Sequence, residues 1–355
     1  MSRKITTTLV LSIALQWVSL PVEEIQARHP EAANPDLPIL VDDYAYQLQG
    51  YAKGLKRVAE SRFDLVVIDY SRFGDAGSEF TKEQIEALKF DGPCGRRIVL
   101  SYMSIGEAET FRFYFDPDWI DEDGNPVPGV APAFLGPSNP DYPDNYKVRF
   151  WMKSWKVIIY GVGQGSEKSY LDRIIDAGFD GVYLDIIDAF EFWGPDEIDG
   201  NDVNRRAPKD MVSFVRQIAR YARRQRGQKD FLVFPQNGAN IIDPEVYVDA
   251  TDPDREARKQ RKRYFKNISG IGAEDTFFFG NRANNNKYKP QQEIIAFLDQ
   301  FLAAGKTVLA VDYLTRAKSI ARSYDEARAQ GYVPYVTKRN LNRLTISKGF
   351  EPTCS

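Results

Sequence analysis

Histidine and cysteine are scarce in this sequence. Its 355 residues include one histidine, His29, and two cysteines, Cys94 and Cys354. A structural Cys/His zinc site takes about four such ligands, so this class of metal site is excluded. His29 lies in the N-terminal leader region, which leaves the mature domain without a histidine for a Ser-His-Asp triad. Any catalysis must therefore use carboxylate, amide, tyrosine, lysine or arginine side chains.

Long apolar runs are equally scarce. The one candidate, residues 5–20, contains three threonines and is shorter than the roughly 20 residues that a membrane-spanning helix needs. Basic residues precede it and the small residue Ala27 follows it, a pattern typical of an export signal. We therefore expect residues 1–27 to be an export signal, with a membrane anchor as the alternative, and residues 28–43 to be a proline-bearing linker.

An export signal implies a secreted or periplasmic protein. In such a compartment Cys94 and Cys354 could form a disulfide or both remain thiols, and the sequence leaves both outcomes open. Beyond the signal, no segment is long and apolar enough for us to expect a membrane span.

A strong net charge and nucleotide-binding motifs are also absent. The formal net charge is −3 and the pI is about 5.6, so no global basic field would attract nucleic acid or an anionic membrane, whereas a cationic partner would be tolerated. No G-x-G-x-x-G follows the first expected strand, and no G-x-x-x-x-G-K-[ST] occurs. We expect no cofactor, no nucleic-acid partner and a monomer.

Eight strand-like apolar runs, most of them separated by helical patterns, organise the rest of the chain. Such an alternation predicts a single-domain α/β protein with a (β/α)8 TIM-type barrel over residues 44–340, followed by a tail over 341–355. An open doubly wound sheet is the alternative. The expected strands are 44–49, 64–70, 97–105, 181–187, 231–234, 268–273, 307–314 and 332–336.

Two segments depart from this alternation. Residues 110–155 combine many aromatic side chains with Asp, Pro and Asn, which predicts a long aromatic loop insertion with little regular structure. Residues 254–263 form a charge run, for which a solvated helix face is the favoured interpretation.

Polar side chains follow the expected strands at their carboxyl ends. In a barrel these ends meet on one face, so the side chains would form an acidic cleft with tyrosine and amide hydrogen-bonding groups. Sugars favour that mixture, because their apolar ring faces stack on aromatic rings while their hydroxyls bind carboxylates and amides. The residues concerned are Tyr46, Asp69, Tyr70, Tyr102, Glu107, Asp185, Asp188, Asn237, Glu274, Asp312 and Tyr313.

Two carboxyl groups that flank a glycosidic bond suffice to hydrolyse it. One protonates the leaving oxygen, and the other attacks the sugar or activates water. A hard divalent cation held by the same acids is the alternative. Because no D-x-[DN]-x-[DN]-G motif occurs and the acids are scattered over several strands, we favour the hydrolase and expect no metal.

Six motifs resemble glycoside hydrolase family 114, the endo-α-1,4-polygalactosaminidase family, which is related to the hydrolase domain acting on the Pel exopolysaccharide. They are YQLQG at 46–50, VVIDYS at 66–71, LSYMSIGEAE at 100–109, FDGVYLDIIDAF at 179–190, PQNGA at 235–239 and GAEDTFF at 272–278. The resemblance covers nearly all of 44–340 and implies a (β/α)8 barrel. It further implies Asp185 as nucleophile and Glu274 as acid/base, with Glu107 as the competing acid.

The resulting hypothesis is an exported endo-acting glycoside hydrolase. It would cleave α-1,4-linked galactosamine-rich polysaccharide, with a retaining outcome, using Asp185 and Glu274 as the catalytic pair. The remaining residues of the polar set would bind substrate, and their negative field would favour a cationic amino sugar. The alternative is a non-catalytic polysaccharide-binding barrel, which would gain support if either catalytic carboxylate were buried in an ion pair with arginine.

Overall fold

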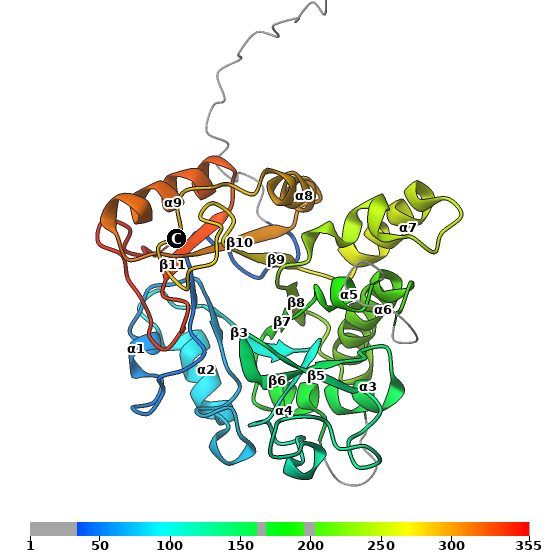
Figure 1. Cartoon of the computed structure of the whole chain (residues 1–355). Coiled ribbons are helices and arrows are strands. Elements are labelled where there is room, and N and C mark those ends of the chain that lie inside the picture. Colours follow the sequence, from blue (N-terminus) through cyan, green and yellow to red (C-terminus); the bar gives the residue numbers. More distant parts are fainter. Residues whose placement is uncertain (1–33, 162–167, 195–202, 355) are drawn as a thin grey trace, which may run out of the picture.

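The computed structural model describes residues 34–161, 168–194 and 203–354 (Figure 1). The expected export signal over 1–27, His29 and the first part of the expected linker lie outside the described residues. Within the described residues, no helix is long and apolar enough to cross a membrane.

Parallel strands form the centre of the molecule. One sheet has the order β1-β2-β3-β7-β8, and a second has the order β9-β10-β11. Each strand is almost entirely buried, as expected for a sheet that is covered by helices. These strands are β1 (Tyr44–Tyr46), β2 (Leu65–Ile68), β3 (Ile98–Ser104), β7 (Gly181–Asp185), β8 (Leu232–Pro235), β9 (Gly270–Glu274), β10 (Thr307–Tyr313) and β11 (Val333–Thr337).

The two sheets meet at β8 and β9. There the Ser269 N–H donates to the Val233 carbonyl at 2.8 Å, and the Asn237 N–H donates to the Gly272 carbonyl at 2.8 Å. β1 and β11 are in contact on the other side, although the described residues share no hydrogen-bonded ladder there. The eight strands thus follow one another in chain order around a barrel, and the predicted TIM-type fold is confirmed.

Helices surround the strands, as Figure 1 shows. A capping box is present at Thr81: the Gln84 N–H donates to Thr81 Oγ1 at 3.3 Å, and the Thr81 N–H donates to Gln84 Oε1 at 2.9 Å. The helices are α1 (Lys56–Ala59), α2 (Lys82–Phe90), α3 (Lys153–Ile159), α4 (Tyr170–Asp176), α5 (Ala189–Phe192), α6 (Ala207–Arg220), α7 (Pro253–Phe265), α8 (Gln292–Ala303) and α9 (Ala317–Ala329). The predicted charge run is the exposed face of α7.

Tyrosine rings fill the barrel interior. Tyr44, Tyr46 and Tyr183 are at most 1% exposed, and the rings of Tyr46 and Tyr183 lie 5.2 Å apart. A Cβ at Gly272 would lie 1.8 Å from the Tyr183 hydroxyl oxygen, so glycine is needed at this position of β9. Since the interior is packed, substrate chemistry is confined to the mouth of the barrel.

The expectation of little regular structure over 110–155 is wrong. β5 (Leu135–Asn139) and β6 (Tyr142–Val148) form an antiparallel sheet with β4 (Glu107–Glu109). Phe134, Tyr146, Phe150 and Trp155 are buried between this sheet and its neighbours rather than open to a ligand. The insertion is therefore a small folded layer whose aromatic side chains extend the core of the barrel.

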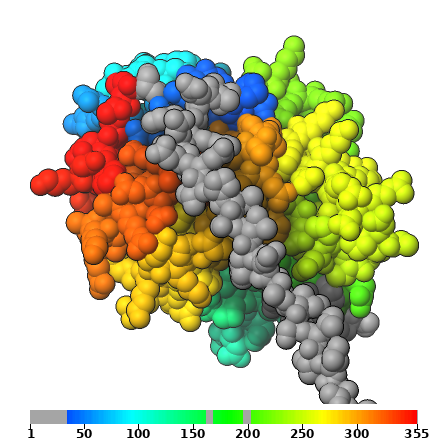
Figure 2. Space-filling model, turned by 90° about the horizontal axis from the view of Figure 1, so that it is seen from above, coloured from blue at the N-terminus to red at the C-terminus, as the bar shows by residue number. Residues whose placement is uncertain are grey.

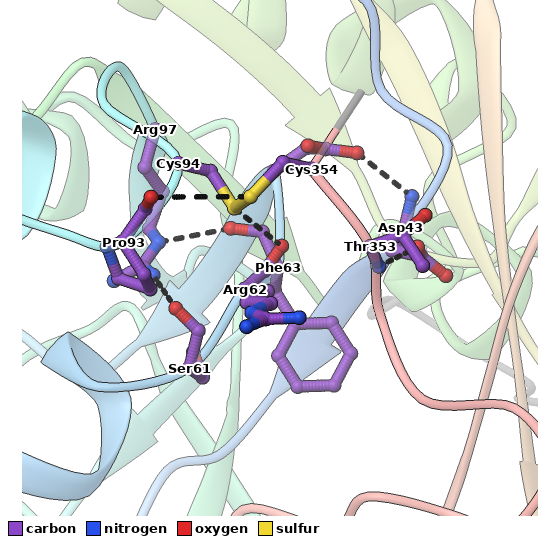
Figure 3. The surroundings of a disulfide bond; sticks show 10 residues. Asp43, Ser61, Arg62, Phe63, Pro93, Cys94, Arg97, Thr353 and Cys354 are labelled. Atoms are coloured by element: carbon purple, nitrogen blue, oxygen red, sulfur yellow. Dashed lines mark hydrogen bonds between the residues drawn. A yellow bond between two sulfur atoms is a disulfide. The ribbon is translucent and has the colours of Figure 1, made fainter.

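A disulfide joins Cys94 to Cys354 with a Cα–Cα distance of 5.2 Å (Figure 3). It attaches the C-terminal tail to the loop between α2 and β3. The neighbouring Thr353 N–H donates to the Asp43 carboxylate at 3.3 Å. Earlier in the tail, the Leu341 carbonyl accepts hydrogen bonds from the N–H groups of Leu48 and Gln49. The tail is thus held against the start of the barrel.

Candidate active site

Asp185 is the last residue of β7 and points a half-buried carboxylate into the mouth of the barrel. Its Oδ2 accepts a hydrogen bond from the Tyr102 hydroxyl at 2.7 Å, and its Oδ1 accepts one from the Ile186 N–H at 2.8 Å. Burial and the negative charge of Glu274 raise the pKa of Asp185 well above its usual value, while these two hydrogen bonds lower it. The two predicted catalytic carboxyls therefore lie close enough to influence each other electrostatically.

Glu274 ends β9 and is also half-buried. Asn237 holds it at two points: the Asn237 amide donates to Glu274 Oε2 at 3.0 Å, and the Glu274 N–H donates to Asn237 Oδ1 at 3.0 Å. The Tyr313 hydroxyl, from the end of β10, donates to Glu274 Oε1. Neither Glu274 nor Asp185 forms an ion pair with a described residue, so neither is neutralised by arginine or lysine.

The backbone at these strand ends is strained. Ile186, Asn237 and Asp275 follow three successive strands and have φ values of 59°, 60° and 52°. For residues other than glycine this left-handed conformation costs about 1–3 kcal/mol and is concentrated at functional sites. Because Gly106 has no Cβ, the Ile186 backbone can lie close to it. A Cβ at Gly106 would lie 2.3 Å from the Ile186 carbonyl oxygen.

Arg339 supports Glu274 indirectly. Its guanidinium lies 3.9 Å from the Tyr313 ring centroid and forms an ion pair with Asp275. The stacked arginine fixes the ring whose hydroxyl donates to Glu274. Arg339 lies just beyond β11, and no feature of its local sequence distinguishes it from other surface arginines.

Three predicted substrate-binding acids have internal partners instead. Asp69 forms a bidentate ion pair with Arg112 at 2.8 and 3.0 Å, and Asp312 accepts from the Ser323 hydroxyl at 2.6 Å. Glu107, fully buried, accepts from Lys147 at 2.6 Å, Asn139 at 2.9 Å and Asn145 at 3.1 Å. All three acids are almost fully buried and bonded within the protein, which favours a structural role for them and disfavours Glu107 as the competing acid.

The predicted tyrosines likewise have internal partners. The Tyr46 hydroxyl donates to Gln236 Oε1 at 3.2 Å, and the Tyr70 hydroxyl donates to the Gly74 carbonyl at 3.2 Å. Both are about 1% exposed. Tyr102 and Tyr313, together with Asn237, donate hydrogen bonds to the carboxylates of Asp185 and Glu274. The predicted tyrosines are therefore buried beneath the candidate site and do not form its surface.

Asp188 differs from the other predicted acids. Its side chain is half-buried and has no hydrogen-bond partner among the described residues. Burial, followed by the charge of Glu191, raises the pKa of Asp188 to about 6, while Lys147 lowers it. Asp188 is thus a carboxyl beside the catalytic pair that can still accept a ligand.

Tyr142 was missed as a site residue by the sequence analysis. It begins β6 at the turn of the insertion hairpin, and it is 53% exposed. Burial raises the pKa of Tyr142, the charge of Arg339 lowers it, and the charges of Glu274 and Asp185 raise it, which makes Tyr142 a candidate residue of the mouth. The signal was present in the Asn-Pro-Asp turn before Tyr142, but an irregular loop was expected there. In the described part of the chain, no group of three or more His, Cys, Asp or Glu could hold a metal ion.

A sequence model of glycoside hydrolase family GH114 matches residues 26–354. The chain belongs to family GH114. The resemblance predicted from the six motifs is confirmed, and this GH114 protein is a glycoside hydrolase. The carboxyl groups and their donors at the barrel mouth are the candidate site of this hydrolase.

Two uncharacterised proteins are similar to this GH114 chain over most of its length. MJ1477 of Methanocaldococcus jannaschii is 35% identical over 313 residues, which cover 85% of this chain and 77% of that protein. A Thermotoga maritima protein is 31% identical over 322 residues, with coverages of 88% and 85%. The crystal structure of Aspergillus fumigatus Ega3 in complex with galactosamine has a TM-score of 0.53 and 18% identity, covering 87% of this chain and 96% of that one. At that identity the likeness shows a common fold alone.

Proposed function

We propose that this GH114 protein is an endo-acting hydrolase of α-1,4-linked galactosamine-rich polysaccharide that uses Asp185 and Glu274. The observation that carries the proposal is the pairing of these two carboxyls at the mouth. They interact electrostatically, and they are held by tyrosine, amide and backbone donors rather than by cationic side chains. Two such carboxyls are the minimum that glycoside hydrolysis requires.

The hydrogen bonds suggest a division of labour. The Tyr102 hydroxyl and the Ile186 N–H stabilise the ionised form of Asp185, as a nucleophile needs. In a retaining reaction, Glu274 donates its proton to the glycosidic oxygen while Asp185 bonds to the anomeric carbon and the glycosidic bond breaks. Water then attacks that carbon, Glu274 takes a proton from the water, and the bond to Asp185 breaks.

Local charge supports a cationic amino sugar as substrate. Asp185, Glu274 and Asp188 are all acidic, and Asp188 has an uncommitted carboxyl beside the pair. A protonated amine would be attracted to this field, whereas an acidic sugar would be repelled. The galactosamine bound to Ega3 agrees with the proposal but belongs to that protein.

Export to a secreted or periplasmic location is part of the proposal. Its support is the basic and apolar N-terminal pattern together with the Cys94–Cys354 disulfide. Disulfides persist mainly in oxidising compartments. Fractionation of the producing cell, followed by N-terminal sequencing of the protein, would test location and cleavage together.

Release of reducing ends from partially deacetylated α-1,4-galactosaminan tests the reaction. We expect release by the wild type, and loss of release in both Asp185→Asn and Glu274→Gln. If only Asp185→Asn abolished release, the proposed reaction would stand, but Glu274 would not be its acid. Binding without release, from this polymer and from a panel of others, would refute the hydrolase and favour a non-catalytic binding barrel.

A further inference from the structure

A polar groove lies on the flank of the barrel between α6 and α7, which pack side by side at the right of Figure 1. Its cavity has a volume of about 300 Å³. The view from above in Figure 2 shows this yellow-green and yellow flank on the right. The groove is lined by Arg206, Lys209, Asp210, Val212, Ser213 and Arg216 from the α6 side, and by Glu256, Lys259, Gln260 and Arg263 from α7.

Five of these lining side chains are cationic and two are acidic. Two of the cations are already paired: Lys209 binds Asp249 at 2.7 Å, and Lys259 binds Glu256 at 3.1 Å. Asp210 accepts a hydrogen bond from the Asn204 amide at 3.1 Å. The local pairs therefore leave an excess of positive charge in a protein whose net charge is −3.

The excess resides on three arginines. Arg206, Arg216 and Arg263 are exposed, and their guanidiniums form no hydrogen bond or ion pair with the described part of the chain. A solvated helix face would spread such residues around the helix, yet these three line one cavity from two elements. Guanidinium presents a planar fork of donors that matches the oxygens of a carboxylate or phosphate group.

The shape of the groove restricts its occupant. A cavity of about 300 Å³ can hold part of a single polymer strand but not a nucleic-acid duplex, which is wider than an α-helix. No aromatic side chain lines the groove among the described residues, so it lacks the stacking surface on which single-stranded nucleic acid depends. Val212 is the one apolar lining residue, which argues against a lipid or an apolar peptide.

We propose that the groove between α6 and α7 binds an acidic polysaccharide, whose carboxylates pair with Arg206, Arg216 and Arg263. This site is separate from the acidic mouth of the barrel and has the opposite charge preference. It would hold the enzyme on an anionic polymer while the mouth acts on another chain. The inference does not depend on the substrate proposed above.

Binding of polygalacturonate, measured by calorimetry at low and at higher salt, tests this site. The decisive variant is Arg216→Glu with Arg263→Glu. The matched control is Arg258→Glu with Lys262→Glu, which places the same charge change on exposed residues that do not line the groove. We expect salt-sensitive binding that weakens more than about tenfold in the groove variant and less than about threefold in the control.

Several outcomes would overturn the proposal. Equal weakening in both variants would mean that diffuse charge on α7 attracts the polymer. Absence of wild-type binding at low salt would remove the site, and displacement of polygalacturonate by double-stranded DNA with the same variant dependence would refute a polysaccharide site. Reducing-end release from galactosaminan, measured in parallel, should be equal in all variants, so failure of this proposal is distinguishable from failure of the proposed reaction.

Discussion

Two groups of acids lie at the carboxyl ends of the barrel strands, and their partners differ. Asp185 and Glu274 are held by neutral donors and remain without a counter-ion in the described residues. Asp69, Glu107 and Glu109, on the β2–β4 side, are ion-paired with Arg112 or Lys147. A neutral donor orients a carboxylate and leaves its charge available to a substrate, whereas a cation neutralises it. The kind of partner therefore separates the proposed catalytic acids from the ion-paired ones.

The largest expected effect comes from replacing one acid of each group by its amide and comparing the two variants. Glu274→Gln should lower kcat about 10²–10⁴-fold, the usual contribution of a general acid/base. Glu107→Gln should change kcat less than about threefold, although it removes one partner of Lys147 and so lowers stability. Steady-state kinetics on galactosaminan, with circular dichroism to confirm folding, compares them. Equal losses of kcat would mean that partner type does not identify the catalytic acid.

Arg112→Met should destabilise the fold by about 3–5 kcal/mol, because it leaves Asp69 and Glu109 buried without a counter-ion. Burial raises the pKa of Glu109 while Arg112 lowers it, so removal of the arginine would raise the pKa of Glu109 further above its unfolded value. Stability would then be retained at low pH, where Glu109 is protonated, and lost as pH rises through its raised folded-state pKa. Urea unfolding at several pH values measures this. A loss that is constant across the acidic range would contradict the counter-ion role.

Tyr102→Phe should move the acidic limb of the kcat/KM profile to higher pH by about one unit. The substitution removes a donor to the ionised form of Asp185, so the already raised pKa of Asp185 rises further and a higher pH is needed to ionise the nucleophile. Tyr70→Phe is the matched control, since that hydroxyl donates to the Gly74 carbonyl. A shift in both variants, or in neither, would mean that the hydrogen bond from Tyr102 does not influence the ionisation of Asp185.

Tyr142→Ala should have the smallest effect, raising KM about threefold to tenfold with little change in kcat. A sugar ring stacked on an exposed aromatic contributes roughly 0.5–1.5 kcal/mol beyond burial. Tyr142→Phe should restore KM. Phe73→Ala is the control, because Phe73 is exposed by 63% but lies in another loop. A fall in kcat with unchanged KM would place Tyr142 in the chemical step instead.

The strands, and the places of Asp185 and Glu274 at their ends, could be predicted because their signals are local. Apolar runs define β7 and β9, and Asp185 and Glu274 end them directly. The same local signal also selected Asp69, Glu107 and Asp312, but it could not show that these acids have internal partners. Their partners Arg112, Lys147 and Ser323 lie 43, 40 and 11 residues away. The sequence shows where an acid ends a strand but not which distant side chain neutralises it.

The insertion was unpredictable for another reason. β5 and β6 are rich in Pro, Asn and Asp, and shifts of pairing register interrupt their alternation. Propensity and periodicity both fail on such strands. Their order comes from the burial of Phe134 and Tyr146 and from the Glu107 network, which are tertiary contacts.

The disulfide has a consequence for how the barrel stays closed. β1 and β11 touch without a hydrogen-bonded ladder among the described residues, and Cys354 is anchored beside this seam. Its bond spans 260 residues of sequence, for which loop closure predicts about 5 kcal/mol of stabilisation. The bond thus holds the tail that follows β11 against the loop that precedes β3, and reduction should free this tail and weaken the seam between β1 and β11. The redox state of the compartment in which the chain folds then sets how long an intact catalytic mouth survives.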